Sequence, residues 1–433
     1  MEYVEMGIWL SITVWLISWI DRRKDRMIPV CIIYYFITVI NDIFFMSTLE
    51  LANAFGISYQ LGDLMMLLFA STFILDIVRK KSIKRNNPNA LITIIFVIML
   101  ISILSGVLIF GFSSEWLGDI RTLFGFIMPI IWFVRFFKVE YVLKYMKLID
   151  KVMLYIAAIS IFLWGIDLII GFHPLKSQYE ALLSDGGSTM RFISSYQVFG
   201  IAIYALFLTR KNLRNSGVIG IKAYVFLGMV ILFQHRSVWM ALALGIIMII
   251  MQESKNKKNT VKLVGQMVLL ILIGTAFLLF SNGDLVKNII HSWDVFLSLM
   301  SGNSVENTTA GTRTQIWHAV INDLNGITML IGRPFGYGYG RSIGWMTSPH
   351  SGYIRLIARI GYIGISIFII LLVWILVRVF KKTPYIPEFI LCFLGFIYGY
   401  DATWLCGCVI GASIGFLVQR KSYGKLIQAT GRR

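Results

Sequence analysis

The residues best suited to chemistry begin with His350, which directly follows Ser348 and Pro349. Ser is favoured at the N-cap of a helix and Pro at its first position, so these residues predict a helix with His350 in its first turn. The unpaired N–H groups and the positive end of the helix dipole favour a bound anion and a neutral imidazole. A general base must be neutral before it accepts a proton. The same pattern also fits a histidine at a membrane surface with no chemical role.

Arg313 lies in a segment with the pattern of an amphipathic helix. Thr312 and Gln315 have the spacing of a capping box, which predicts that the helix begins at Thr312. Apolar residues three, four and seven positions after Arg313 place it at the centre of an apolar stripe, and His318 falls on the opposite face. The apolar stripe is Ile316, Trp317, Val320, Ile321 and Leu324. Because burying an arginine is costly without an anionic partner, Arg313 is a candidate anion ligand.

Further arginines lie in segments that we expect to face the same side of a membrane. Arg236 stands between two apolar runs, where a guanidinium suits bidentate contact with a phosphate. An arginine that reaches lipid phosphates fits this position as well. Arg333 and Arg341 flank the glycine-rich segment 332–340, which we interpret as a flexible rim near a substrate. Arg191 is another candidate for binding an anion.

Arg355 and Arg359 follow His350 on the helix predicted to begin there. At 100° per residue they lie about 140° and 180° round the helix from the histidine, so they point away from its face. An arginine in the middle of a span costs roughly 2.5–3.5 kcal/mol, so each should have an acidic partner. Asp167 and Asp401 are two candidates. We therefore expect Arg355 and Arg359 to be structural.

The outward segments contain no paired aspartates at short spacing and no two histidines four residues apart, so neither a metal site nor a cofactor is predicted. They offer one histidine and several arginines instead. Such a set can hold a diphosphate leaving group with cationic side chains while a base activates a hydroxyl.

Membrane-spanning helices must position these side chains. The chain has 433 residues, of which 57% are hydrophobic and 14% charged, against roughly a quarter charged in soluble domains. Its net charge of +18 is gathered in basic clusters between apolar runs, which is the positive-inside pattern and not a nucleic-acid-binding surface. We therefore predict an all-α, multi-pass membrane protein with a single integral membrane domain, residues 1–433, and no nucleic-acid partner.

Apolar runs predict thirteen spans, with an error of one or two, so about 12–14 transmembrane helices. The predicted spans are 3–20, 28–46, 60–78, 90–112, 119–137, 152–171, 195–209, 217–234, 237–251, 263–280, 350–377, 387–400 and 403–418. The basic clusters at 79–87 and 254–262 then lie in the cytoplasm. The long segment 281–349 becomes a large, partly helical loop on the outer face, and loops of this length are usually functional.

Three blocks of sequence resemble the O-antigen ligase and polymerase superfamily of bacterial envelope glycosyltransferases. The blocks are QHRSVWMALA at 234–243, GTRTQIW at 311–317 with GYG at 336–338, and PHSGYI at 349–354 with GYIG at 361–364. Their order, their spacing and their placement round a large outer loop match this superfamily. The resemblance covers roughly residues 195–380.

This resemblance implies a C-type membrane glycosyltransferase fold and metal-independent transfer of a glycan from undecaprenyl diphosphate to an acceptor sugar. The reaction would take place at the outer face of the bacterial cytoplasmic membrane. By the family's pattern, Arg236 and Arg313 match the arginines that hold the diphosphate, and His350 matches the base. Tyr353 stands where ligases tend to carry Asn, which favours a polymerase. The expected partners are a lipid-linked oligosaccharide donor and acceptor, the bilayer and a chain-length regulator.

A polymerase would join lipid-linked repeat units into O-antigen or capsular polysaccharide. The first alternative is an O-antigen ligase, which transfers the glycan to a lipid A core-type acceptor. A polysaccharide flippase would need polar residues at the membrane midplane and internal repeats, and the sequence shows no repeat. A structural scaffold protein of an envelope complex would not explain why Arg313 lies on an apolar stripe.

Overall fold

The computed structural model describes residues 2–44, 50–54, 57–80, 88–170, 192–233, 235–253, 309–339, 341–344, 349–382, 387–399 and 404–418, with a few residues between 261 and 268. Helices account for nearly all of the secondary structure in this part of the chain, which confirms the prediction of an all-α polytopic membrane protein.

Six helices in the described part of the chain are long and apolar enough to cross a membrane by themselves. They are α1 (Glu2–Arg22), α2 (Met27–Phe44), α3 (Leu61–Lys80), α5 (Ser114–Phe136), α6 (Val139–Ile170) and α15 (Gly352–Lys382). The other predicted spans in the described chain are also helices: α4 (Pro88–Phe110), α8 (Ser195–Ser216), α9 (Ile221–Leu232), α10 (Arg236–Glu253), α16 (Pro387–Gly399) and α17 (Trp404–Val418). The predicted span 263–280 lies largely outside the described residues.

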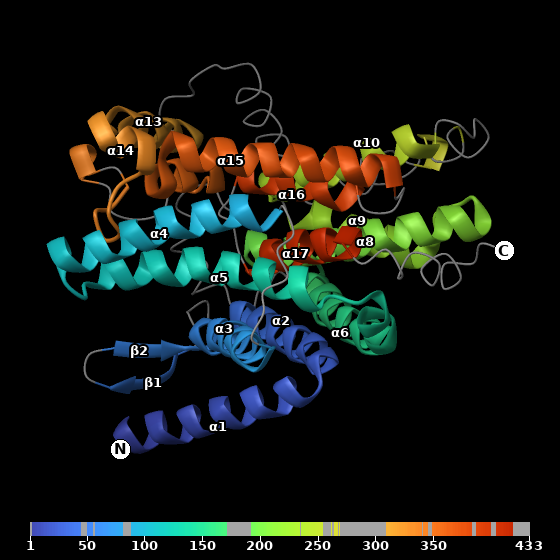
Figure 1. Ribbon diagram of the computed structural model, residues 1–433. Helices are drawn as coiled ribbons and strands as arrows, with labels where there is room; N and C mark the ends of the chain where they lie inside the picture. The colour runs from blue at the N-terminus through green and yellow to red at the C-terminus, as the bar shows by residue number, and fades with distance from the viewer. Residues whose placement is uncertain are drawn as a thin grey trace.

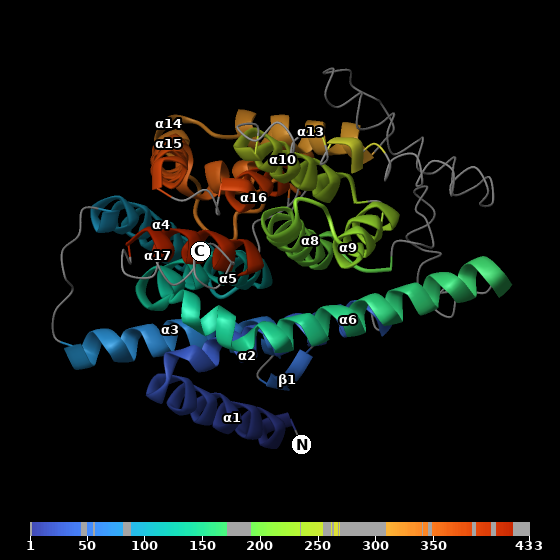
Figure 2. The ribbon, with the colours of Figure 1, turned by 90° about the vertical axis from the view of Figure 1, so that its right-hand side faces the viewer.

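The helices pack in layers. Figure 2 shows α1 on the outside of a layer formed by α2, α3 and α6, with α10, α13 (Thr309–Asn322), α15 and α16 on the far side. Only 11% of the residues in the most apolar stretch of α1 are buried, so this helix presents most of its surface to lipid. The best-packed partners are α5 with α17 and α10 with α16.

Glycines explain how α17 approaches α5 so closely. A Cβ on Gly407 would lie 2.2 Å from the carbonyl oxygen of Phe126, and one on Gly415 would lie 2.6 Å from that of Phe133. Gly411 stands midway between them on the same face of α17. Small residues four apart allow two helix backbones to touch in a membrane, where packing replaces the hydrophobic effect as the driving force.

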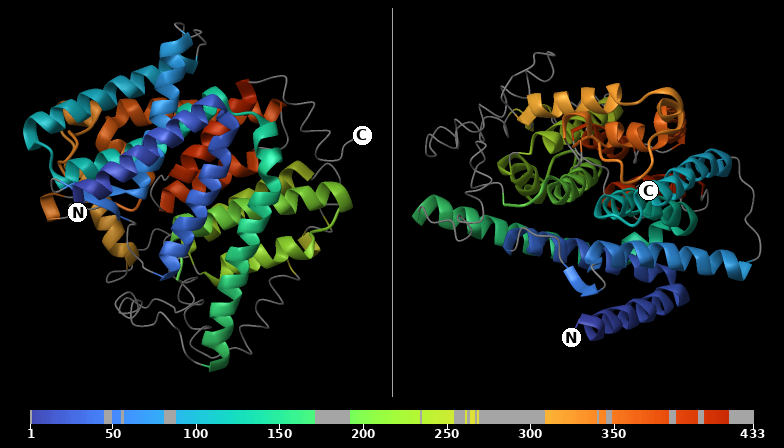
Figure 3. Two further views of the ribbon diagram at one scale, coloured as in Figure 1. Left: turned by 90° about the horizontal axis from the view of Figure 1, so that it is seen from below. Right: turned by 90° about the vertical axis from the view of Figure 1, so that its left-hand side faces the viewer.

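One end of the molecule carries the structure that does not belong to the spans. Strands β1 (Glu50–Ala54) and β2 (Ile57–Gln60) form an antiparallel hairpin there, near the start of α3. Figure 1 shows this hairpin, α13 and α14 (Gly326–Ile331) at the left, and the right panel of Figure 3 views this end directly. We call it the hairpin end; by the charge rule it is the outer face. The hairpin was not predicted from the sequence.

Two predicted helix starts are wrong. Helix α13 begins at Thr309, so Thr312 lies inside it and is not an N-cap. Helix α15 begins at Gly352, so His350 precedes the helix instead of lying in its first turn. The cause at the second start is the backbone of His350, whose φ of 50° is left-handed and cannot continue a right-handed helix.

Candidate active site at the hairpin end

Residues 332–339, which we call the glycine-rich insert, are built into the bundle between α4, α5 and α15. The backbone N–H of Arg333 donates to the carbonyl of Ala358 at 2.7 Å. Ser102 on α4 donates its hydroxyl to the carbonyl of Arg333 at 2.6 Å, and its own carbonyl accepts from the N–H of Phe335 at 3.1 Å. Phe335 is fully buried. The insert is therefore a packed part of the core, and the prediction of a flexible rim is wrong.

The glycines permit this close approach. A Cβ on Gly332 would lie 2.3 Å from the carbonyl carbon of Arg359, and one on Gly361 would lie 2.2 Å from the carbonyl oxygen of Leu330. Both glycines have positive φ values, 87° and 61°. Any side chain would therefore meet a steric clash and an unfavourable backbone at once.

Asp119 on α5 is the centre of the contacts that hold the insert. Its carboxylate lies 2.6 Å from the guanidinium of Arg359, and these side chains are 6% and 1% exposed. The same carboxylate accepts hydrogen bonds from the N–H of Gly336 at 2.8 Å and from the hydroxyl of Tyr339 at 2.7 Å. Arg359 also donates to the carbonyl of Pro334 at 3.0 Å. A buried charge must be paired and hydrogen-bonded, and here both charges are.

Asp119 is thus the acidic partner that was expected for Arg359. The two candidates suggested by the sequence were Asp167 and Asp401; the side chain of the first and the whole of the second lie outside the described part of the chain. Asp119 could have been noticed as a carboxylate close to the start of an apolar helix, since such residues are rarely without a function.

Helix α13 docks on the insert and on α15 through its apolar stripe. Ile316 and Val320 are each 1% exposed and pack in one cluster with Tyr339 and Ala358. His318 is exposed, as predicted. The periodicity of the sequence therefore predicted the correct face of α13, although it misplaced the helix start.

The same helix brings Arg313 towards His350. The indole N–H of Trp317 donates to the carbonyl of Pro349 at 2.7 Å, and Pro349 immediately precedes His350. Arg313 lies one turn before Trp317 on the same face of α13, a separation of about 5–6 Å between Cβ atoms. Arg313 is half-buried. The two predicted residues are therefore held on adjoining segments of the structure.

His350 is the single non-glycine residue with positive φ in the described part of the chain. A left-handed backbone costs a residue of this kind on the order of 1–3 kcal/mol and persists only where the surroundings impose it. Here Trp317 holds the residue before His350. The residue after it, Ser351, directly precedes α15, and its carbonyl accepts from the N–H of Arg355 at 3.0 Å. Backbones of this kind gather at functional sites.

The first residue of α10 is Arg236, whose side chain is outside the described part of the structure. Its neighbour His235 is buried and fixes the helix start. The His235 Nε2–H donates to the carbonyl of Ile193 at 2.6 Å, and Nδ1 lies 2.8 Å from the hydroxyl of Ser195. Asp42 on α2 in turn accepts from the N–H of Ser194 at 3.1 Å. The start of α10 is thus anchored to α8 and α2.

The remaining candidates differ in what the structure shows. Arg333 is buried, forms an ion pair with Asp323 at 3.4 Å and stacks over the ring of Tyr337 at 4.3 Å. Its proposed contact with substrate stays a prediction. Arg191 lies outside the described residues, and so does the side chain of Arg341.

A cavity of about 300 Å³, which we call the polar cavity because Asp63, Arg121 and Arg355 line it, opens beside this site. Its polar and aromatic lining includes Tyr34, Asp63, Arg121, Tyr196, Arg355 and Trp404. Asp63 and Arg121 form two parallel hydrogen bonds of 2.9 Å each. Arg355 thus faces a cavity, which the sequence did not predict. Within the described residues, no three His, Cys, Asp or Glu side chains gather closely enough to hold a metal ion.

A family model described as O-antigen ligase matches residues 221–369, about a third of the chain. This segment is similar to the O-antigen ligase family. The match confirms the resemblance carried by the three sequence blocks. The O-antigen ligase segment includes α9, α10, α13, the glycine-rich insert and the first half of α15, and therefore every candidate site residue except Arg191. No curated protein and no solved structure matches the chain.

Proposed function

We propose that the protein is a polysaccharide polymerase that transfers lipid-linked oligosaccharide repeat units onto one another at the outer face of the bacterial cytoplasmic membrane. The observation that carries this proposal is the O-antigen ligase segment, within which α13 is tied to the residue before His350. The C-type membrane glycosyltransferase fold and the undecaprenyl diphosphate carrier are part of the same proposal.

In this mechanism Arg236 and Arg313 hold the diphosphate of the donor. His350 accepts the proton of the acceptor hydroxyl as its oxygen attacks the anomeric carbon of the donor sugar. The bond between that carbon and the diphosphate oxygen breaks, and the lipid diphosphate leaves with the bonding electrons. Two guanidinium groups stabilise the developing negative charge, which is the role that a divalent cation has in other glycosyl transfers.

The polar cavity is suited to a sugar ring of the acceptor or donor. Trp404 and Tyr196 offer flat apolar faces that can cover the C–H face of a pyranose. Asp63, Arg121 and Arg355 offer charged hydrogen-bond partners for its hydroxyl groups. Because Arg355 belongs to α15, this cavity adjoins the helix that follows His350.

Tyr353 supports a polymerase over a ligase. Its hydroxyl donates to the carbonyl of Leu394 on α16 at 3.3 Å, so the side chain contributes to helix packing. By the resemblance, ligases tend to carry Asn at this position, and a short amide could not make this interhelical contact in the same way.

Deletion of the gene in its host tests the proposal. A polymerase deletion should leave single repeat units on their usual end point, with long chains missing, when the glycans are resolved by size. Accumulation of long chains on the lipid diphosphate, with none at the final anchor, would show that the protein is a ligase.

A chelator separates the arginine mechanism from a metal-dependent one. Purified protein should keep its activity in excess EDTA, because side chains supply the cations at the diphosphate. Loss of activity that magnesium or manganese restores would rule out the arginine mechanism.

A further inference from the structure

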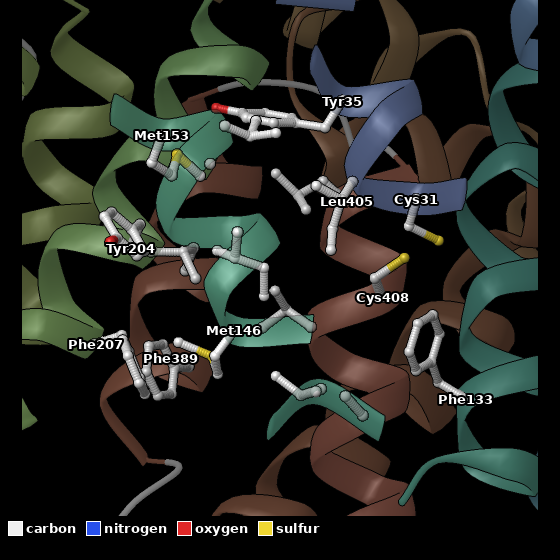
Figure 4. Close-up of a pocket in the computed structure, with 18 of the residues that line it drawn as sticks. Cys31, Tyr35, Phe133, Met146, Met153, Tyr204, Phe207, Phe389, Leu405 and Cys408 are labelled. Carbon is white, nitrogen blue, oxygen red and sulfur yellow. The ribbon is translucent and has the colours of Figure 1, made fainter. Parts of the chain in front are cut away.

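A second cavity, of about 440 Å³, lies between α2, α5, α6, α8, α16 and α17 and shares Trp404 with the polar cavity. Figure 4 shows its lining, in which Met146, Met153, Phe207, Phe389, Leu405 and Cys408 are labelled. Nearly every lining residue is apolar. Arg210 and Lys211 are the charged residues of the lining, and both are basic.

The length of the cavity corresponds to one leaflet of a bilayer. On α8 its lining runs from Gly200 to Lys211, which at 1.5 Å per residue is roughly 16 Å. The hydrocarbon core of a membrane is about 30 Å thick, so each leaflet contributes about half of that. An acyl chain of a phospholipid reaches from the headgroup region to the midplane, which is the same distance.

The two ends of the cavity differ. At the end towards the hairpin, the Tyr35 hydroxyl donates to the carbonyl of Gln197 at 2.6 Å, and Trp404 packs edge-on against Tyr34 with ring centroids 4.7 Å apart. Tyr35 and Trp404 line that end, and Trp404 also lines the polar cavity, so these packed rings stand between the two cavities. A long isoprenoid chain with its head on the hairpin side would have to pass through them.

The opposite end is basic. Arg210 is buried there and lies 3.7 Å from the carboxylate of Glu388, so its charge is already used within the bundle. Lys211 is exposed beside it. By the charge rule this end faces the cytoplasm, where anionic lipids attract basic residues near the membrane surface.

We propose that this cavity binds one acyl chain of an anionic phospholipid from the leaflet at the basic end, with Lys211 contacting the lipid phosphate. The apolar lining suits an acyl chain, and the length of roughly 16 Å matches a single leaflet. The exposed lysine suits the negative charge of the headgroup. Binding of this lipid does not depend on the proposed polymerase reaction.

The acyl chain is tested by filling the cavity. Full-length protein is reconstituted in nanodiscs of phosphatidylethanolamine and phosphatidylglycerol, released, and examined by native mass spectrometry for retained lipid. The unaltered protein should keep one phosphatidylglycerol molecule. Ala412→Phe places a ring in the cavity from α17 and should abolish retention, whereas Ala158→Phe, on the exposed surface of α6, should not.

The headgroup contact is tested separately, so that a misfolded Ala412→Phe variant does not decide the outcome. Lys211→Gln should still retain a lipid but lose about fivefold in preference for phosphatidylglycerol over phosphatidylethanolamine, the effect expected of one basic residue at a membrane surface. Lys151→Gln, at another exposed lysine, is the matched control. Retention of a polyprenyl phosphate, of no lipid, or of the same lipid by folded Ala412→Phe protein would overturn the proposal.

Discussion

The hairpin end and the basic end of the molecule both bring acidic and basic side chains together, but in different surroundings. At the basic end, Asp21 and Asp25 are contacted by Arg79, Arg23 and Lys144, whose side chains are 65%, 55% and 47% exposed. These flexible, hydrated cations lose little when their partners are removed.

At the hairpin end, Arg359 and Asp119 are almost completely buried, and the carboxylate also binds the glycine-rich insert. Removing one partner there leaves an uncompensated charge in the core. The comparison indicates that the exposed cations beside Asp21 and Asp25 contribute little to stability, whereas the buried Asp119–Arg359 pair determines the structure on which the candidate site is built.

The largest effect is expected at Asp119. Asp119→Ala should destabilise the protein by about 3–5 kcal/mol, because it strands the Arg359 charge and releases two hydrogen-bond donors of the insert. Thermal unfolding in detergent measures this. The double variant Asp119→Ala/Arg359→Met should recover part of the loss; if it is no more stable than the single variant, the stranded charge is not the cause.

The next effect is on activity. It distinguishes Arg313, a proposed ligand of the substrate, from Arg359, which is structural. Arg313→Ala and His350→Ala should each lower the transfer rate by about 10²–10³ while the unfolding temperature stays unchanged. Arg313→Lys should rescue poorly, since an ammonium cannot form the bidentate contact. His318→Ala, on the exposed face of α13, is the control. If His318→Ala impairs transfer as much as His350→Ala does, the apolar stripe does not identify the face of α13 that contacts the substrate.

At the basic end, removal of a partner should have a small effect. Arg79→Ala breaks the ion pair with Asp21 and should change stability by less than about 1 kcal/mol, because the arginine is largely exposed. The same thermal unfolding assay applies. A loss as large as that of Asp119→Ala would remove the distinction between the two ends.

The smallest effect is expected for Asp25, and it depends on pH. Burial alone raises the pKa of its carboxyl, but hydrogen bonds from Lys144 and Arg23 outweigh burial and hold the pKa below its ordinary value. The contribution to stability is therefore complete above the unfolded pKa of about 4 and is lost as the pH falls through the folded value. Unfolding temperatures of Asp25→Asn and the unaltered protein should differ at pH 7 and converge in strong acid; a constant difference would contradict this.

The sequence predicted the spans well because each is a long apolar run, and a membrane leaves a chain few other choices. It also predicted the buried face of α13 from periodicity. It could not predict that His350 takes a left-handed backbone, since tertiary contacts from Trp317 and α15 impose it. The partnership of Asp119 with the insert was equally hidden, because local pattern carries no information about contacts between residues 217 positions apart.

That separation along the chain has a consequence for biosynthesis. Helices α4 and α5 leave the ribosome long before the insert that fills the space between them, and Gly336 follows Asp119 by 217 residues. At 5–20 residues per second, synthesis of the intervening chain takes about 10–40 s. Throughout that interval the nascent protein holds α4 and α5 in the membrane with the place of the insert empty. Final assembly of the site is therefore a late event. The insert, which follows several later spans in the sequence, must pack against two helices that were made much earlier.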